Sequence, residues 1–169
     1  MKGIVLYVCI LFSLPSPAQM ATADNQPPEV TTRVTIPADA WLFGVFEGRS
    51  PCTEIASQLN VTKGPECIKM KWRLILYKDA HTHQPTTYTL YGTFSSEPRT
   101  GKWTITRGMS DNPGAIVYQL HLDKPHKPFY LLKGDDNVLF ILDEKKNFRV
   151  GNADFSYTLN RVKLIPAKQ

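Results

Sequence analysis

Apolar and polar residues alternate along most of the chain that follows residue 67. In the segment 68–79, Met70, Trp72 and Leu74 fall on one face, and basic residues fall on the other. Alternation with a period of two predicts a β-strand with one buried and one solvated face. The same reasoning predicts strands over residues 41–46, 68–79, 86–94, 101–107, 115–123, 129–132, 138–142 and 154–165.

A different spacing appears between the first two of these strands. Thr53 can cap a helix, and Ile55, Ala56 and Leu59 would share one of its faces. Residues 53–60 are therefore expected to form a short helix.

This number of strands with short connections predicts an all-β fold. Antiparallel strands in a meander lose their exposed edges by closing, so residues 41–169 are expected to form a small antiparallel meander β-barrel of about eight strands with one short helix. Such a barrel is wide enough to be filled by side chains or to hold one small ligand. The bulky residues expected to point inward and fill it are Trp72, Tyr88, Phe94, Trp103, Tyr118, Phe129, Phe140 and Tyr157.

The first 18 residues have the composition of a secretory signal peptide. Lys2 precedes an apolar run over residues 3–14, and small residues place a cleavage site after Ala18, with a second candidate after Ala23. The run is too short for a good membrane span. Cys9 lies inside it and would be removed with it, so no lipid anchor is expected.

The segment 19–40 is polar and contains prolines, which predicts a flexible leader with a candidate edge strand at 30–36. Export places the mature protein in the periplasm or outside the cell. The formal net charge is +5 and becomes +4 once Lys2 is removed. The basic residues are scattered, so no nucleic-acid partner is expected.

Two cysteines, Cys52 and Cys67, remain after export. An even number of cysteines in an oxidising compartment favours a disulfide. The alternative is a thiol pair that binds copper(I) or senses redox state when reduced, because soft thiolates suit that ion.

Charged residues lie beside the first cysteine. Glu47 and Arg49 flank a glycine and, with Pro51, are expected to form an interaction surface. The two charges could pair with each other or remain separately exposed. The chain has no Gly-x-Ser-x-Gly, phosphate-binding glycine loop or His-Glu-x-x-His motif, so an enzyme is not expected.

Several short stretches follow one another in a recognisable order between residues 44 and 162. They are Gly44-Val45-Phe46 with Pro51-Cys52, then residues 76–79, 88–90, 92–94, 101–105, 138–143 and 155–159. In this order they resemble the N-terminal domain of the NlpE copper-resistance lipoproteins, a lipocalin-like small barrel of the Gram-negative envelope.

The resemblance implies an exported interaction module linked to copper resistance and envelope-stress sensing, whose protein partner meets the surface formed by residues 41–67. The family's opening carries a Cys-x-x-Cys pair, which is proposed to respond to copper or redox state. Only Cys52 matches that pair, because Ile55 stands at the second position. The alternatives are a lipocalin-like carrier of a small apolar ligand and a purely structural, disulfide-stapled barrel.

Overall fold

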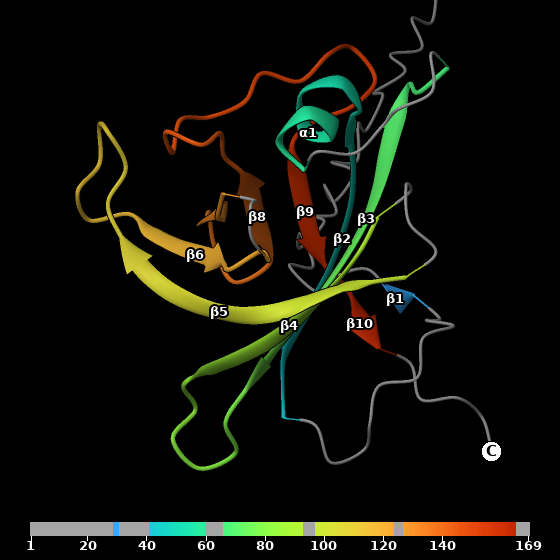
Figure 1. The fold of residues 1–169 in the computed structure, drawn as a ribbon. Coiled ribbons are helices and arrows are strands. Elements are labelled where there is room, and N and C mark those ends of the chain that lie inside the picture. The colour runs from blue at the N-terminus through green and yellow to red at the C-terminus, as the bar shows by residue number, and fades with distance from the viewer. Residues whose placement is uncertain (1–28, 31–40, 60–65, 93–96, 124–126, 165–169) are drawn as a thin grey trace, which may run out of the picture.

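The computed structural model describes residues 29–30, 41–59, 66–92, 97–123 and 127–164. Within them, eight antiparallel strands close into a barrel in which each strand pairs with the next, and β2 pairs with β9 (Figure 1). The strands are β2 (Leu42–Pro51), β3 (Lys69–Lys78), β4 (Pro85–Tyr91), β5 (Arg99–Arg107), β6 (Ile116–Leu120), β7 (Phe129–Lys133), β8 (Val138–Ile141) and β9 (Thr158–Arg161). The expected all-β meander barrel is confirmed.

Two further short strands in the described part of the chain lie outside the barrel. β1 (Glu29–Val30) pairs in parallel with β10 (Lys163–Leu164). The remainder of the candidate edge strand, together with the predicted signal peptide and most of the predicted leader, lies outside the described residues.

The first and last barrel strands differ in length from the prediction. β2 continues to Pro51 because its whole length pairs with β3, ending at Pro51 opposite Lys69. β9 begins only at Thr158, so the strand predicted from residue 154 is wrong at its start. Asn152 explains this, because its side-chain oxygen accepts hydrogen bonds from the backbone N–H groups of Asp154 and Phe155, which holds the segment in a turn.

Large apolar side chains from all the barrel walls meet in the interior. Phe46, Tyr88, Trp103 and Phe129 are at most 1% exposed. The ring centroids of Trp103 and Tyr118 lie 5.2 Å apart, which is an ordinary distance for packed aromatic residues. Six of the eight residues expected to point inward belong to this core, namely Trp72, Tyr88, Trp103, Tyr118, Phe129 and Tyr157.

Phe140 was expected in the core and is not part of it, while Phe94 lies outside the described residues. The inward positions of β8 are Leu139 and Ile141, and Phe140 packs on Phe148 with ring centroids 5.7 Å apart. All four residues of β8 are apolar, so their pattern does not distinguish the two faces. The register with β7 sets the orientation, because Ile141 lies opposite the buried Leu131 and residues opposite each other share a face.

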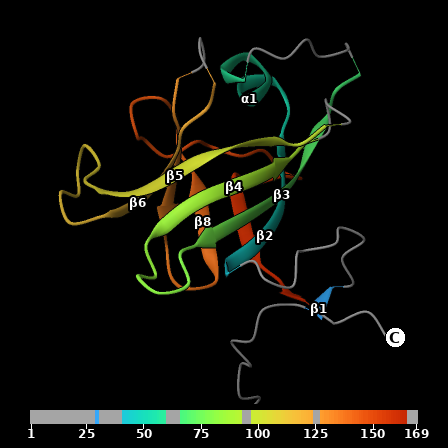
Figure 2. The same ribbon diagram turned by 60° about the horizontal axis from the view of Figure 1, so that its bottom comes forward.

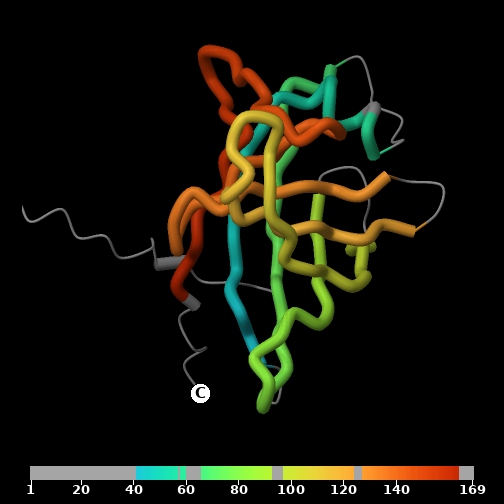
Figure 3. The backbone as a smooth tube through the Cα atoms, turned by 90° about the vertical axis from the view of Figure 1, so that its left-hand side faces the viewer, coloured from blue at the N-terminus to red at the C-terminus, as the bar shows by residue number. Residues whose placement is uncertain are grey.

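Helix α1 (Thr53–Gln58) covers one end of the barrel, and the turn between β3 and β4 lies at the other end (Figures 2 and 3). Ile55 and Leu59 are buried in the same core as the strands, as their spacing predicted. The first helical hydrogen bond runs from the Ala56 N–H to the Cys52 carbonyl, so Cys52 rather than Thr53 occupies the cap position.

Tyr88 gives the core a measurable pH dependence. Its hydroxyl donates to the His121 carbonyl at 3.2 Å, and burial raises its pKa to about 12. Because the folded pKa exceeds the unfolded value, the stabilising contribution is complete below pH 10 and is lost as the pH rises toward 12. Urea unfolding should therefore show stability falling over this interval.

The Tyr88→Phe variant should show a shallower loss of stability over the same interval, because it has no hydroxyl to ionise at that position. Tyr130→Phe removes the hydroxyl of a half-buried tyrosine and serves as the matched comparison. Equal slopes in all three proteins would contradict the assignment to Tyr88.

Candidate functional site

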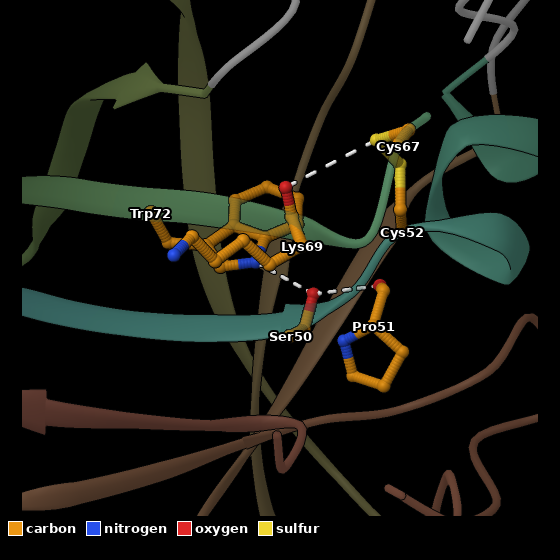
Figure 4. The surroundings of a disulfide bond; sticks show 6 residues. All are labelled: Ser50, Pro51, Cys52, Cys67, Lys69 and Trp72. Atoms are coloured by element: carbon orange, nitrogen blue, oxygen red, sulfur yellow. Dashed lines mark hydrogen bonds between the residues drawn. A yellow bond between two sulfur atoms is a disulfide. The ribbon is translucent and has the colours of Figure 1, made fainter. Parts of the chain in front are cut away.

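A disulfide joins Cys52 to Cys67, as the cysteine count had predicted (Figure 4). The Cα atoms are 5.9 Å apart although the residues are 15 positions apart in sequence. Their proximity follows from strand pairing, because Pro51 and Lys69 lie opposite each other at the ends of β2 and β3. Cys52 is 1% exposed. With the bond closed, neither sulfur is a thiolate that could ligate copper(I).

A buried hydrogen bond supports the barrel wall next to the disulfide. The Trp72 indole N–H donates to the Ser50 hydroxyl oxygen at 2.9 Å, and this hydroxyl donates to the Pro51 carbonyl at 3.1 Å. Ser50 is fully buried, so these two bonds satisfy a polar group that would otherwise destabilise the core. Cys67 Sγ lies 4.0 Å from the Lys69 carbonyl oxygen and, as a disulfide sulfur, has no proton to donate (Figure 4).

An open groove of about 480 Å³ runs over the outer wall of the barrel next to this region. It contains two of the three residues expected to form the interaction surface, Glu47 and Arg49, whereas Pro51 does not line it. The full lining is Glu47, Gly48, Arg49, Lys71, Trp72, Asp154, Phe155, Ser156, Asn160 and Val162. The groove thus combines β2, β3, β9 and the turn before β9.

The charge partner of Glu47 is Arg73 of β3, at 2.5 Å, and not Arg49. Glu47 and Arg73 lie directly opposite each other in the strand pair. Side chains opposite each other are about 5 Å apart at Cβ, whereas residues two apart on one strand are separated by nearly 7 Å. The pairing of Glu47 with Arg49 that the sequence allowed is therefore wrong, and Arg49 remains exposed.

A second polar cluster ties α1 to the segment between β8 and β9. Arg149 pairs with Glu54 at 2.9 Å and donates to the side-chain oxygen of Gln58 and to the Leu142 carbonyl. Its guanidinium lies 5.6 Å from the Tyr157 ring centroid, and its side chain is 8% exposed. The sequence did not predict this cluster, because Arg149 lies more than 90 positions from Glu54 and Gln58.

We expect Arg149→Ala to lower the free energy of unfolding by about 1–3 kcal/mol, because it removes charge-assisted hydrogen bonds from a nearly buried position. Urea denaturation would measure the change. Lys145→Ala, on an exposed neighbour, is the control and should stay within about 0.5 kcal/mol of wild type. Equal stability of the two variants would show that the cluster contributes little.

A second groove, of about 410 Å³, lies beside this cluster, but its carboxylates are already engaged. Glu54 pairs with Arg149, Glu144 pairs with Lys127, and Asp143 accepts backbone N–H groups from its own turn. Among the residues that the structure describes, no three His, Cys, Asp or Glu side chains are grouped to hold a metal ion. In the groove beside Glu47 and Arg49, Arg49 belongs to none of the ion pairs among the described residues, so this groove is the stronger candidate site.

No family model, curated protein or solved structure matches the chain. The disulfide indicates an oxidising, extracytoplasmic location. In the described part of the chain, no helix has the length and apolar character needed to cross a bilayer.

Proposed function

We propose that this protein is an exported interaction module of the Gram-negative envelope, not an enzyme, and that a protein partner meets it at the groove beside Glu47 and Arg49. The observation that carries the proposal is the groove itself, which is open, has a volume of about 480 Å³ and contains the exposed Arg49. All the residues that line the groove lie between residues 44 and 162, the part of the chain whose order of motifs resembles the NlpE domains. The disulfide gives this surface a rigid support, since it joins the ends of β2 and β3.

Packing of the interior argues against the alternative of a lipocalin-like carrier. Phe43 lies 5.0 Å from Trp103 and 5.7 Å from Tyr118 between ring centroids, and Trp72 lies 5.7 Å from Phe129. Side chains from opposite walls therefore occupy the space that a carrier would leave for its ligand. This favours recognition at the outer surface.

Copper handling, which the resemblance implies, would require Cys52 and Cys67 in the reduced state. We expect an anaerobic copper(I) titration of the oxidised protein to show no binding that depends on these cysteines, because the disulfide removes both thiolates. The Cys52→Ala/Cys67→Ala variant is the control and should give the same curve. Tight binding by the oxidised wild type alone would contradict this prediction.

The same titration after reduction tests the copper-linked form of the proposal. Stoichiometric binding that is lost in the double variant would make the cysteine pair a metal site. Absence of binding would mean that the disulfide only stabilises the fold. Binding of a protein partner would then remain as the proposed function.

Site-specific photo-crosslinking tests the partner itself. A photoreactive residue at Asn160, which is exposed in the groove, should give one discrete adduct in cells that export the protein, and excess unlabelled protein should suppress it. A photoreactive residue at Lys102, exposed on β5, should give no such adduct. No adduct from Asn160, or the same adduct from both positions, would overturn the proposal.

A further inference from the structure

Two cations face each other across the strand pair that forms the groove. Arg49 of β2 lies opposite Lys71 of β3, and both side chains are exposed. Like charges directly opposite each other in a sheet are destabilising. None of the four ion pairs among the described residues includes either of them. This part of the barrel wall therefore holds an unfavourable charge pair that an anion would relieve.

The neighbouring charges make the surface more basic. Lys69 lies two residues from Lys71 on the same strand and is also exposed, with its amine 5.9 Å from the centroid of Phe155 in the groove. Glu47 is already engaged by Arg73, so it does not neutralise Arg49 or Lys71. Asp154 is the remaining carboxylate in the groove lining.

The closed barrel limits how a partner can bind there. Each barrel strand pairs with a neighbour on both sides, although β2 pairs with β9 only from Phe46 to Gly48, so no barrel strand offers a free edge along its whole length for an extra strand to join. We therefore expect recognition at the groove to rely on its side chains. On an extended chain, every second side chain lies on the same face at a spacing of about 6.8 Å, which is also the spacing of Lys69 and Lys71 along β3.

We infer that the groove binds an acidic, extended segment of a partner protein, whose carboxylates meet Arg49, Lys71 and Lys69. This inference rests on the proposed function and specifies the chemistry of the partner. The salt-dependent attraction between the basic surface and an acidic segment would also speed their encounter.

Fluorescence anisotropy with a labelled ten-residue peptide of alternating glutamate and serine tests the inference. The purified, disulfide-bonded protein should bind this peptide, and should bind a peptide of alternating glutamine and serine at least about tenfold more weakly. Affinity for the acidic peptide should fall as salt is raised. Equal binding of the two peptides, or no binding of the acidic one, would overturn the inference.

Charge-matched variants locate the binding surface. Arg49→Glu/Lys71→Glu should weaken binding of the acidic peptide by about tenfold or more. Lys102→Glu/Arg107→Glu makes the same change in net charge with exposed residues of β5 and should stay within about twofold of wild type. Equal losses in both variants would mean that net charge, not the groove, attracts the peptide.

Vesicles of phosphatidylglycerol distinguish a protein partner from a membrane surface. Binding to these vesicles without binding to the acidic peptide would overturn the inference. A position-specific adduct from Asn160, together with no affinity for the acidic peptide, would leave the proposed function intact and would remove only the acidic chemistry assigned to the partner.

Discussion

Replacing Cys52 and Cys67 by alanine is expected to lower the free energy of unfolding by about 3 kcal/mol. The disulfide closes a loop of 15 positions, and the entropy of closing such a loop in the unfolded chain corresponds to about this free energy. The bond also anchors the start of α1, whose Ile55, together with Leu59 just after the helix, covers one end of the core. Loss of the bond should therefore loosen the helix as well as destabilise the barrel.

Urea denaturation of the wild type, with and without a strong reductant, would measure this effect. Cys52 is buried, so the alanine variant also loses packing at that position. Reduction of the wild type removes the cross-link without removing the sulfur atoms and therefore separates the two contributions. Reductant should have no effect on the double variant. If reduction leaves the midpoint of the wild type unchanged, the disulfide is not a stabilising staple.

Gly48→Ala is expected to destabilise the protein by about 3 kcal/mol, at the upper end of the range for overpacked cores. Gly48 lies opposite Leu159 where β2 and β9 close the barrel. A Cβ atom at Gly48 would lie 2.2 Å from the Thr158 carbonyl oxygen and 2.9 Å from a methyl carbon of Leu159. A backbone oxygen cannot rotate away as a side chain can, so β2 and β9 would have to separate.

Gly92→Ala is the matched control, because no atom lies within 4 Å of the position that its Cβ would occupy. Its stability should stay within about 0.5 kcal/mol of wild type. Thermal or urea unfolding of the two variants gives the comparison directly. The prediction would be wrong if both variants unfold together with the wild type, since the contact between β2 and β9 would then have room for a methyl group.

Gly48 also links the fold to the candidate site. It lines the groove between Glu47 and Arg49, so a shift of β2 away from β9 would displace the residues that we assign to partner binding. Gly48→Ala should therefore weaken the crosslink from Asn160 more than Gly92→Ala does. Disulfide removal acts at the adjacent end of the same strand and provides a second, independent way to perturb this surface.

Features that depend on near neighbours in the chain could be read from the sequence. Alternation in residues 68–79 placed a strand with Met70, Trp72 and Leu74 on its buried face, because the side-chain period of a strand is a local property. The spacing of Ile55, Ala56 and Leu59 placed the helix for the same reason. The even number of cysteines expected after cleavage of the predicted signal peptide was sufficient to predict the disulfide.

Features that depend on how distant segments meet were decided by the tertiary structure alone. Because of the register between β7 and β8, Phe140 faces outward. The register between β2 and β3 places Glu47 opposite Arg73 and Arg49 opposite Lys71. The groove exists because the turn before β9 passes beside those strands, and no local pattern specifies that placement. A strand's pattern sets which residues share a face, whereas the identity of the residue opposite depends on packing of the whole barrel.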